Sequence, residues 1–158
     1  NGVTIKAATC AESGKEYMFE GQKYYVARDK DDIKAKIAAN AYPANRIVTT
    51  RVTDMSWMFY QNPSFNQDIA NWDTSNVTDM RVMFHSAQSF NQPLNNWDTS
   101  KVTDMSYMFF HAQSFNQPLN NRRINQISDE NLKIMFHDAT AFKAKQLYCN
   151  WANWSAKK

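Results

Sequence analysis

Three histidines are the side chains in this sequence best suited to binding a metal ion. His85 and His137 follow equivalent phenylalanines in repeated segments, and His111 lies one position out of phase. Two repeats separate His85 from His137, about 10 Å at strand spacing, whereas zinc–nitrogen bonds are about 2 Å long. No cysteine or carboxylate pair stands beside them at ligand spacing. We therefore expect solvent-exposed histidines, with no metal and no cofactor.

Aspartates recur at two positions of the repeats, at Asp54, Asp79 and Asp104 and again at Asp73 and Asp98. A glycosidase-like mechanism requires two carboxylates that face one cleft. A catalytic residue is needed once, however, whereas a cap or a turn is needed in every repeat. The sequence also lacks a serine elbow, a zincin helix and a glycine-rich phosphate loop. These patterns predict no catalytic residue.

Aromatic side chains are the best candidates for binding. Trp72 and Trp97 occupy equivalent positions, where they form either an aromatic platform for a ligand or part of the core. The third repeat has Arg122 at that position. A second row, Tyr60, His85 and Phe110, immediately follows the apolar residues of each repeat. The residue type in this row varies while its position in the repeat stays the same, which suggests exposure to solvent. The ligand-binding candidates are Trp72, Trp97, Arg122, Tyr60, His85 and Phe110.

These residues belong to a 25-residue repeat that begins at Val52, Val77 and Val102. A fixed period of this length is typical of stacked coils that bury apolar faces against each other. Apolar residues at i, i+3 and i+4 predict a short helix in each coil, preceded by Thr53 and Asp54 or their copies as N-caps. Residues 67–72, 92–97 and 117–122 are predicted as parallel strands. The predicted core consists of Met55, Met58, Phe59, Phe65, Ile69, Val77, Met80, Met83, Phe84, Phe90, Leu94, Val102, Met105, Met108, Phe109, Phe115, Leu119, Leu132, Met135 and Phe136.

The two ends of the chain depart from the repeat. Residues 1–50 predict a capping α/β subdomain with a strand at 3–7, a hairpin that turns near Gly21, and a helix capped by Asp31 or Asp32. Residues 51–147 hold three regular coils and a degenerate closing coil, and residues 148–158 form a tail. We expect one structural domain, a right-handed α/β solenoid with one short helix and one short parallel strand per coil.

Composition limits the classes of protein to consider. The chain has 158 residues, 43% of them hydrophobic, and a net charge of +3 without a basic block. This pattern argues against nucleic-acid binding, and no apolar stretch is long enough to cross a bilayer. Stacking would hold Cys10 and Cys149 too far apart for a disulfide, so we expect two free thiols in a monomer.

The run VTDMSYMFFHAQSFNQPLNN and its two copies resemble the repeat of BspA-like leucine-rich repeat surface proteins, which also occurs in mycoplasma lipoprotein-associated domains. The resemblance covers Val52 to about Phe142. It implies a leucine-rich-repeat-like solenoid, an extracellular or cell-surface location, and adhesion to a host or cell-surface protein or glycan.

Three functions follow as hypotheses. The first is a non-enzymatic recognition module that binds through an exposed strand row and the adjacent loops. The second is a structural spacer within a larger surface protein. The third is a hydrolase with a shallow site on the cap near Tyr17, Tyr24 and Asp31 or Asp32.

Overall fold

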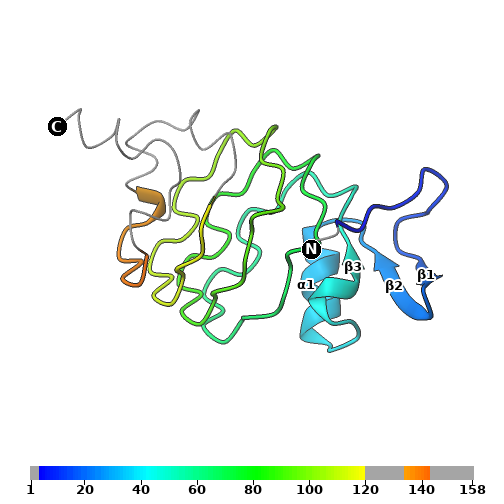
Figure 1. The fold of residues 1–158 in the computed structure, drawn as a ribbon, viewed down its shortest axis with the longest axis horizontal. Helices are drawn as coiled ribbons and strands as arrows, with labels where there is room; N and C mark the ends of the chain where they lie inside the picture. Colours follow the sequence, from blue (N-terminus) through cyan, green and yellow to red (C-terminus); the bar gives the residue numbers. More distant parts are fainter. Residues whose placement is uncertain (1–3, 120–133, 143–158) are drawn as a thin grey trace.

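The structure is a computed structural model that describes residues 4–119 and 134–142. Its named elements in these ranges are β1 (Glu16–Phe19), β2 (Gln22–Val26), α1 (Lys30–Ala38), the 3-10 helix η1 (Ala44–Arg46) and β3 (Ile47–Val48). They form one end of the molecule, and the repeated segments extend from them as a series of loops lying side by side (Figure 1).

The predicted hairpin near Gly21 is present. Strands β1 and β2 are antiparallel, with Glu16 opposite Tyr25, and β3 pairs with β2 in parallel. The two residues between β1 and β2 are Glu20 and Gly21, with φ of 48° and 73°. Two successive positive φ angles match the twist of the flanking strands, and glycine adopts them without steric cost.

Helix α1 begins after Asp29, whose carboxylate accepts a hydrogen bond from the backbone N–H of Asp32 at 2.8 Å. The assignment of the cap to Asp31 or Asp32 is therefore wrong. Both residues lie in the first turn, where a negative charge is favoured next to the free N–H groups. Asn40, with a φ of 50°, follows the end of the helix.

The strand predicted at residues 3–7 is not formed over its described part, residues 4–7. Instead, the N–H of Ile5 donates to the carbonyl of Asn71 at 3.0 Å, and the N–H of Ala7 donates to the hydroxyl of Thr50 at 2.9 Å. These bonds attach the beginning of the chain to the first coil.

The three short helices predicted in the regular coils are replaced by consecutive turns. Within the first coil, Tyr60 donates to the carbonyl of Trp57 and Asn62 donates to that of Phe59, each three residues back. Trp57, Val82 and Tyr107 share a φ close to 60°, as do Gln61, Ser86 and His111 within about 10°. A right-handed helix cannot contain such residues, because every φ in it lies near −63°.

Backbone hydrogen bonds also join the turns of one coil to those of the next. The N–H groups of Met55, Trp57, Phe59 and Gln61 donate to carbonyls of the second coil at 2.9 to 3.1 Å. Alternate residues of the second coil donate to the third in the same way. A tight turn returns the i+3 residue to the same side as a helical turn would, so the apolar spacing is compatible with both conformations. The spacing alone therefore did not distinguish turns from a helix.

The predicted strands are also absent from the described residues 67–72, 92–97 and 117–119. Parallel pairing occurs instead at single residues, where Asp54 pairs with Asp79 and Asp79 with Asp104. The Oδ1 atoms of Asp54, Asp79 and Asp104 accept from the backbone N–H two residues ahead at 2.8 to 3.0 Å. These aspartates open turns, and the prediction that they cap helices is wrong.

The core between the coils is built from columns of rings. Phe59, Phe84, Phe109 and Phe136 stack with centroids 5.4 to 5.5 Å apart. Phe65, Phe90, Phe115 and Phe142 form a second column at 5.9 to 6.0 Å. Most predicted core residues are buried; Val102 and Phe136 are partly buried and pack against this cluster. The ring columns continue through 134–142, so successive repeats contact each other through equivalent side chains.

Polar side chains add a second set of links between coils. The buried hydroxyls of Thr49 and Thr74 donate to the carbonyls of Asp73 and Asp98 at 2.9 and 3.0 Å. Hydrogen bonds to buried groups stabilise most when both partners are satisfied, so these links help to hold the register between coils.

Several sequence predictions fall wholly or partly outside the described residues. Arg122, Leu132, Cys149 and the tail at 148–158 lie wholly outside them, and the strands predicted at 3–7 and 117–122 and the closing coil lie partly outside. Cys10 is exposed with a free thiol.

Candidate functional site

An exposed row of rings crosses the turn side of the coils. We call it the aromatic row and define it as Trp57, Tyr60, His85, Tyr107, Phe110, His111 and His137. The side chains of Trp57, Tyr60 and Tyr107 are 46%, 38% and 42% exposed, although they are large and apolar. Isolated exposed apolar residues are ordinary, but rings that contact each other across four coils form a continuous surface.

Ring contacts connect the whole row. The centroid of Tyr60 lies 4.9 Å from Trp57 and 5.1 Å from His85. The ring of Phe110 lies between His85 and His137, at 4.8 and 4.9 Å with interplanar angles of 14° and 10°. His111 lies edge-on to Phe110 at 4.4 Å, and Tyr107 lies 5.7 Å from Phe110.

The turns position this row. The rings of Trp57 and Tyr107, both at a positive φ, are exposed, whereas the next residues, Met58 and Met108, are buried in the core. Hydrogen bonds between coils set the register, because Gln61 donates to the carbonyl of His85 and Ser86 to that of Phe110. Rings from successive coils are therefore held at the coil spacing.

Two of the three histidines of the row share one carboxylate. The Nδ1 atoms of His111 and His137 lie 3.6 and 3.4 Å from Oδ2 of Asp138. The Nδ1 of His85 lies 3.0 Å from the hydroxyl of Ser86. Burial lowers the pKa of His85, and the neighbouring His111 lowers it further. The region thus combines apolar rings with groups that gain charge in acid.

The sequence-based candidates separate into three sets. Trp72 and Trp97 are 1% and 3% exposed, and their indole N–H groups donate to the carbonyls of Ala44 and Ile69. Both are core residues, so their inclusion among the ligand-binding candidates is corrected here. Tyr60, His85 and Phe110 belong to the aromatic row, and Arg122 lies outside the described residues.

Four members of the row were not among the sequence-based binding candidates: His111 and His137, which were considered only as metal ligands, and Trp57 and Tyr107. Trp57 and Tyr107 precede a buried methionine and are equivalent to Val82. Variation among Trp, Val and Tyr at one phase is the same signal that identified Tyr60, His85 and Phe110. This variation does not by itself indicate exposure, because Val82, at the same phase and with a similar φ, is buried.

The repeated carboxylates have structural partners. Asp54 pairs with Lys30 at 2.7 Å, and Asp79 pairs with Arg81 at 3.1 Å. On the cap, Asp32 accepts from the hydroxyl of Tyr25 and from the backbone and guanidinium of Arg28. These bonds satisfy the carboxylate of Asp32 within the cap.

Across residues 4–119 and 134–142, no group of three or more His, Cys, Asp or Glu side chains is placed to hold a metal ion.

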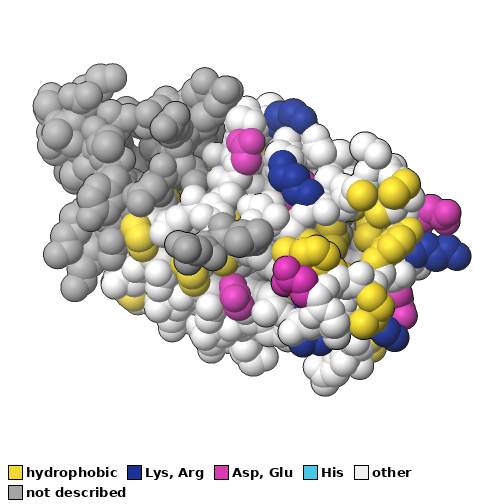
Figure 2. Space-filling model, turned by 45° about the vertical axis from the view of Figure 1, so that its right-hand side comes forward, with side chains coloured by type: hydrophobic (Ala, Val, Ile, Leu, Met, Phe, Trp, Pro, Cys, Tyr) yellow, Lys and Arg dark blue, Asp and Glu magenta, His cyan; other side chains and the backbone are white. Residues whose placement is uncertain are grey.

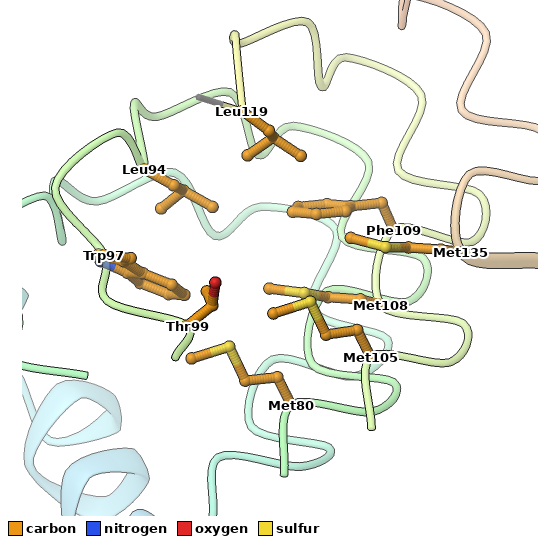
Figure 3. A pocket seen from close by; sticks show the side chains of 9 residues that line it. All are labelled: Met80, Leu94, Trp97, Thr99, Met105, Met108, Phe109, Leu119 and Met135. Atoms are coloured by element: carbon orange, nitrogen blue, oxygen red, sulfur yellow. The ribbon is translucent and has the colours of Figure 1, made fainter. Parts of the chain in front are cut away.

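A small cavity lies inside the stack rather than on its surface. It is lined by Met80, Leu94, Trp97, Thr99, Met105, Met108, Phe109, Leu119 and Met135, whose side chains converge from several coils (Figure 3). Its volume is about 10 Å³. That is about the space of a single water molecule, and a water there would find few polar partners. This cavity is therefore a packing defect of the core and not a ligand site.

A second exposed apolar patch covers the cap. On β1, Tyr17, Met18 and Phe19 are 38%, 66% and 53% exposed. Hydrophobic side chains gather at this end of the molecule (Figure 2).

None of the described helices has the length and apolar character to cross a membrane.

In the described residues, successive repeats contact each other and carry the partly exposed aromatic row. Residues 18–151 match the family model described as a Mycoplasma protein of unknown function, DUF285. The match covers most of the chain, which therefore belongs to this family. No curated protein and no solved structure matches the chain.

Proposed function

We propose that this protein is a non-enzymatic recognition module that binds a protein or glycan on a host or cell surface through the aromatic row. The observation that carries the proposal is the continuity of ring contacts from Trp57 through Phe110 to His137. In this row Trp57, Tyr60, Tyr107 and His137 are exposed, and His85, Phe110 and His111 are partly buried. Tyrosine, tryptophan and other rigid rings bury large areas on binding at a low cost in conformational entropy. The contact surface is placed on the turns, in contrast to the strand row expected from the sequence.

The proposal includes a fold class and a location. We infer a leucine-rich-repeat-like right-handed solenoid of the BspA-like type, because equivalent rings and backbone groups of successive repeats contact each other. The inferred location is extracellular or at the cell surface, where adhesion modules of that type act. This part of the proposal rests on the resemblance of the repeat.

The test is an array of matrix proteins and glycans probed with the purified chain and with Trp57→Ala/Tyr60→Ala. Tyr17→Ala/Phe19→Ala is the matched control, because it removes two rings of similar exposure from β1. We expect a ligand that binds the wild type and the control, and binds the Trp57/Tyr60 variant at least tenfold more weakly, a loss of about 1.4 kcal/mol.

Two outcomes would overturn the proposal. Equal loss in the control would show that binding depends on general apolar exposure rather than on the aromatic row. Binding that survives the removal of Trp57 and Tyr60 would place the contact elsewhere. An array without any ligand for the wild type would favour the structural spacer.

A further inference from the structure

Both faces of Phe110, in the middle of the aromatic row, are covered, which limits what can bind there. His85 and His137 lie parallel to the two faces of Phe110, at 4.8 and 4.9 Å. A sugar packs its apolar face on an open aromatic face. The inner rings of the row instead present their edges, which carry the positive part of the ring quadrupole. Ring edges favour acceptor groups such as carboxylates.

The charge of this region depends on pH. The chain contains three histidines, and all three lie here. With neutral imidazoles, the three histidines and Asp138 carry one negative charge; with all imidazoles protonated they carry two positive charges. The side chains of His111 and His137 are 41% and 60% exposed, so solvent and a ligand can reach them.

Other charged and titratable groups near the row do not cancel this change in charge with pH. Asp54 and Asp79 are paired with Lys30 and Arg81, so each carboxylate already has a cation. Asp104 accepts from the backbone and hydroxyl of Ser106 and adds one negative charge at the margin. Tyr60 contacts His85 through its ring. A protonated ring of His137, which is the more exposed of the two stacked histidines, also gains a cation–π contact with Phe110.

We propose that the aromatic row binds an acidic polypeptide segment and does so more tightly in mild acid than at neutral pH. This inference rests on the proposed function, since it names the partner class of the same surface. Imidazolium N–H groups of His111 and His137 donate to carboxylates of the partner, while Trp57 and Tyr60 contact its apolar side chains.

The probe is fluorescein-labelled poly-aspartate, whose side chains stay ionised at about pH 5. Binding is measured by fluorescence anisotropy at about pH 5 and pH 7.5, at one ionic strength of about 0.15 M. We expect the wild type to bind roughly tenfold more tightly in acid, as a few charge-assisted contacts of modest strength would produce. His85→Gln/His111→Gln/His137→Gln should abolish that ratio. Asp138→Asn should tighten binding in acid, because it removes the competing carboxylate.

Several results would overturn the inference. They are an unchanged affinity of the wild type between the two pH values, a pH ratio that persists in the triple variant, and tighter binding of a neutral oligosaccharide than of poly-aspartate. Near-ultraviolet circular dichroism checks the fold of each variant. If the triple variant does not fold, the wild-type ratio and the His111→Gln variant decide the matter.

The two proposals can fail separately. Suppose that Trp57→Ala/Tyr60→Ala loses array binding and that the affinity for poly-aspartate does not change with pH. This result would support the recognition module and contradict the proposal of an acidic partner. Retained array binding in that variant removes the aromatic row as the contact surface altogether.

Discussion

The indole rings of Trp72 and Trp97 are parallel to within 2°, and their centroids lie 6.4 Å apart. Each indole N–H donates to a carbonyl 28 residues earlier in the chain, Ala44 for Trp72 and Ile69 for Trp97. The pair connects the cap to the first coil and the first coil to the second. Its role is therefore to join units of the fold.

Trp72→Ala should destabilise the protein by about 3–5 kcal/mol, because it leaves a large cavity and removes the hydrogen bond from the indole N–H to the carbonyl of Ala44. Urea unfolding followed by circular dichroism measures the change. The matched control is Trp57→Ala, which removes an exposed indole and should alter the free energy of unfolding by less than about 1 kcal/mol. Similar losses in both variants would contradict the assignment of Trp72 to the core and Trp57 to the surface.

Gln61→Gly distinguishes turns from a helix by the sign of its effect. Gln61 is exposed and has a φ of 50°, a conformation that costs a non-glycine residue about 1 kcal/mol. Glycine removes this cost, and its larger entropy in the unfolded chain offsets part of the gain, so the expected result is a stabilisation of up to about 1 kcal/mol.

In a helix the same substitution would destabilise by about 1 kcal/mol. The comparison is Gln88→Gly, at an exposed residue without a positive φ, which should lose about 0.5–1 kcal/mol. A clear loss in Gln61→Gly, measured by urea unfolding, would indicate a helical segment.

Asn91→Ala should cost about 1–2 kcal/mol, because Oδ1 of Asn91 accepts from the backbone N–H of Asn116 and from the amide of Gln117. Both donors belong to the next coil, and the N–H of Asn91 itself donates to Oδ1 of Asn66 in the previous one. The control is Asn96→Ala, at an exposed asparagine of the same repeat, with an expected change of less than about 0.5 kcal/mol. Thermal denaturation of both variants checks the difference.

The stability of the cap should fall in acid through Asp32. Burial alone would raise the pKa of this carboxyl, but hydrogen bonds from Arg28 and Tyr25 hold it below the ordinary value of 3.8. A depressed pKa in the folded state stabilises the protein above the unfolded pKa, and this stability is lost as the pH falls through the folded pKa. The loss should therefore occur below about pH 4.

Asp32→Asn should be less stable than the wild type at about pH 6, and the difference should shrink as the pH is lowered toward 2.5. Asp31→Asn is the control, since Asp31 is an exposed neighbour on the same helix, and its difference from the wild type should show no such trend. The free energy of unfolding in urea across this pH range provides the measurement. A constant difference for Asp32→Asn would show that its carboxylate is not held ionised by Arg28.

The sequence alone determined the repeat boundaries, the hairpin at Gly21, the helix in the cap and most of the residues that are buried. The period and the apolar spacing indicate which side chains face the core. They do not distinguish a helix from consecutive turns, because both give the same spacing. Local patterns also predicted exposure of Tyr60, His85 and Phe110; Tyr60 is exposed, whereas His85 and Phe110 are partly buried.

The tertiary structure decided the backbone conformation of the repeats, the burial of Trp72 and Trp97, and the assembly of Trp57 and Tyr107 into the aromatic row. The physical reason is that backbone groups of one coil are satisfied by the next coil, as the N–H of Phe59 is by the carbonyl of Met83. These partners are 24 residues apart, so no local pattern predicts the conformation that their hydrogen bonds stabilise. The side of the coil on which a ring lies follows from that conformation.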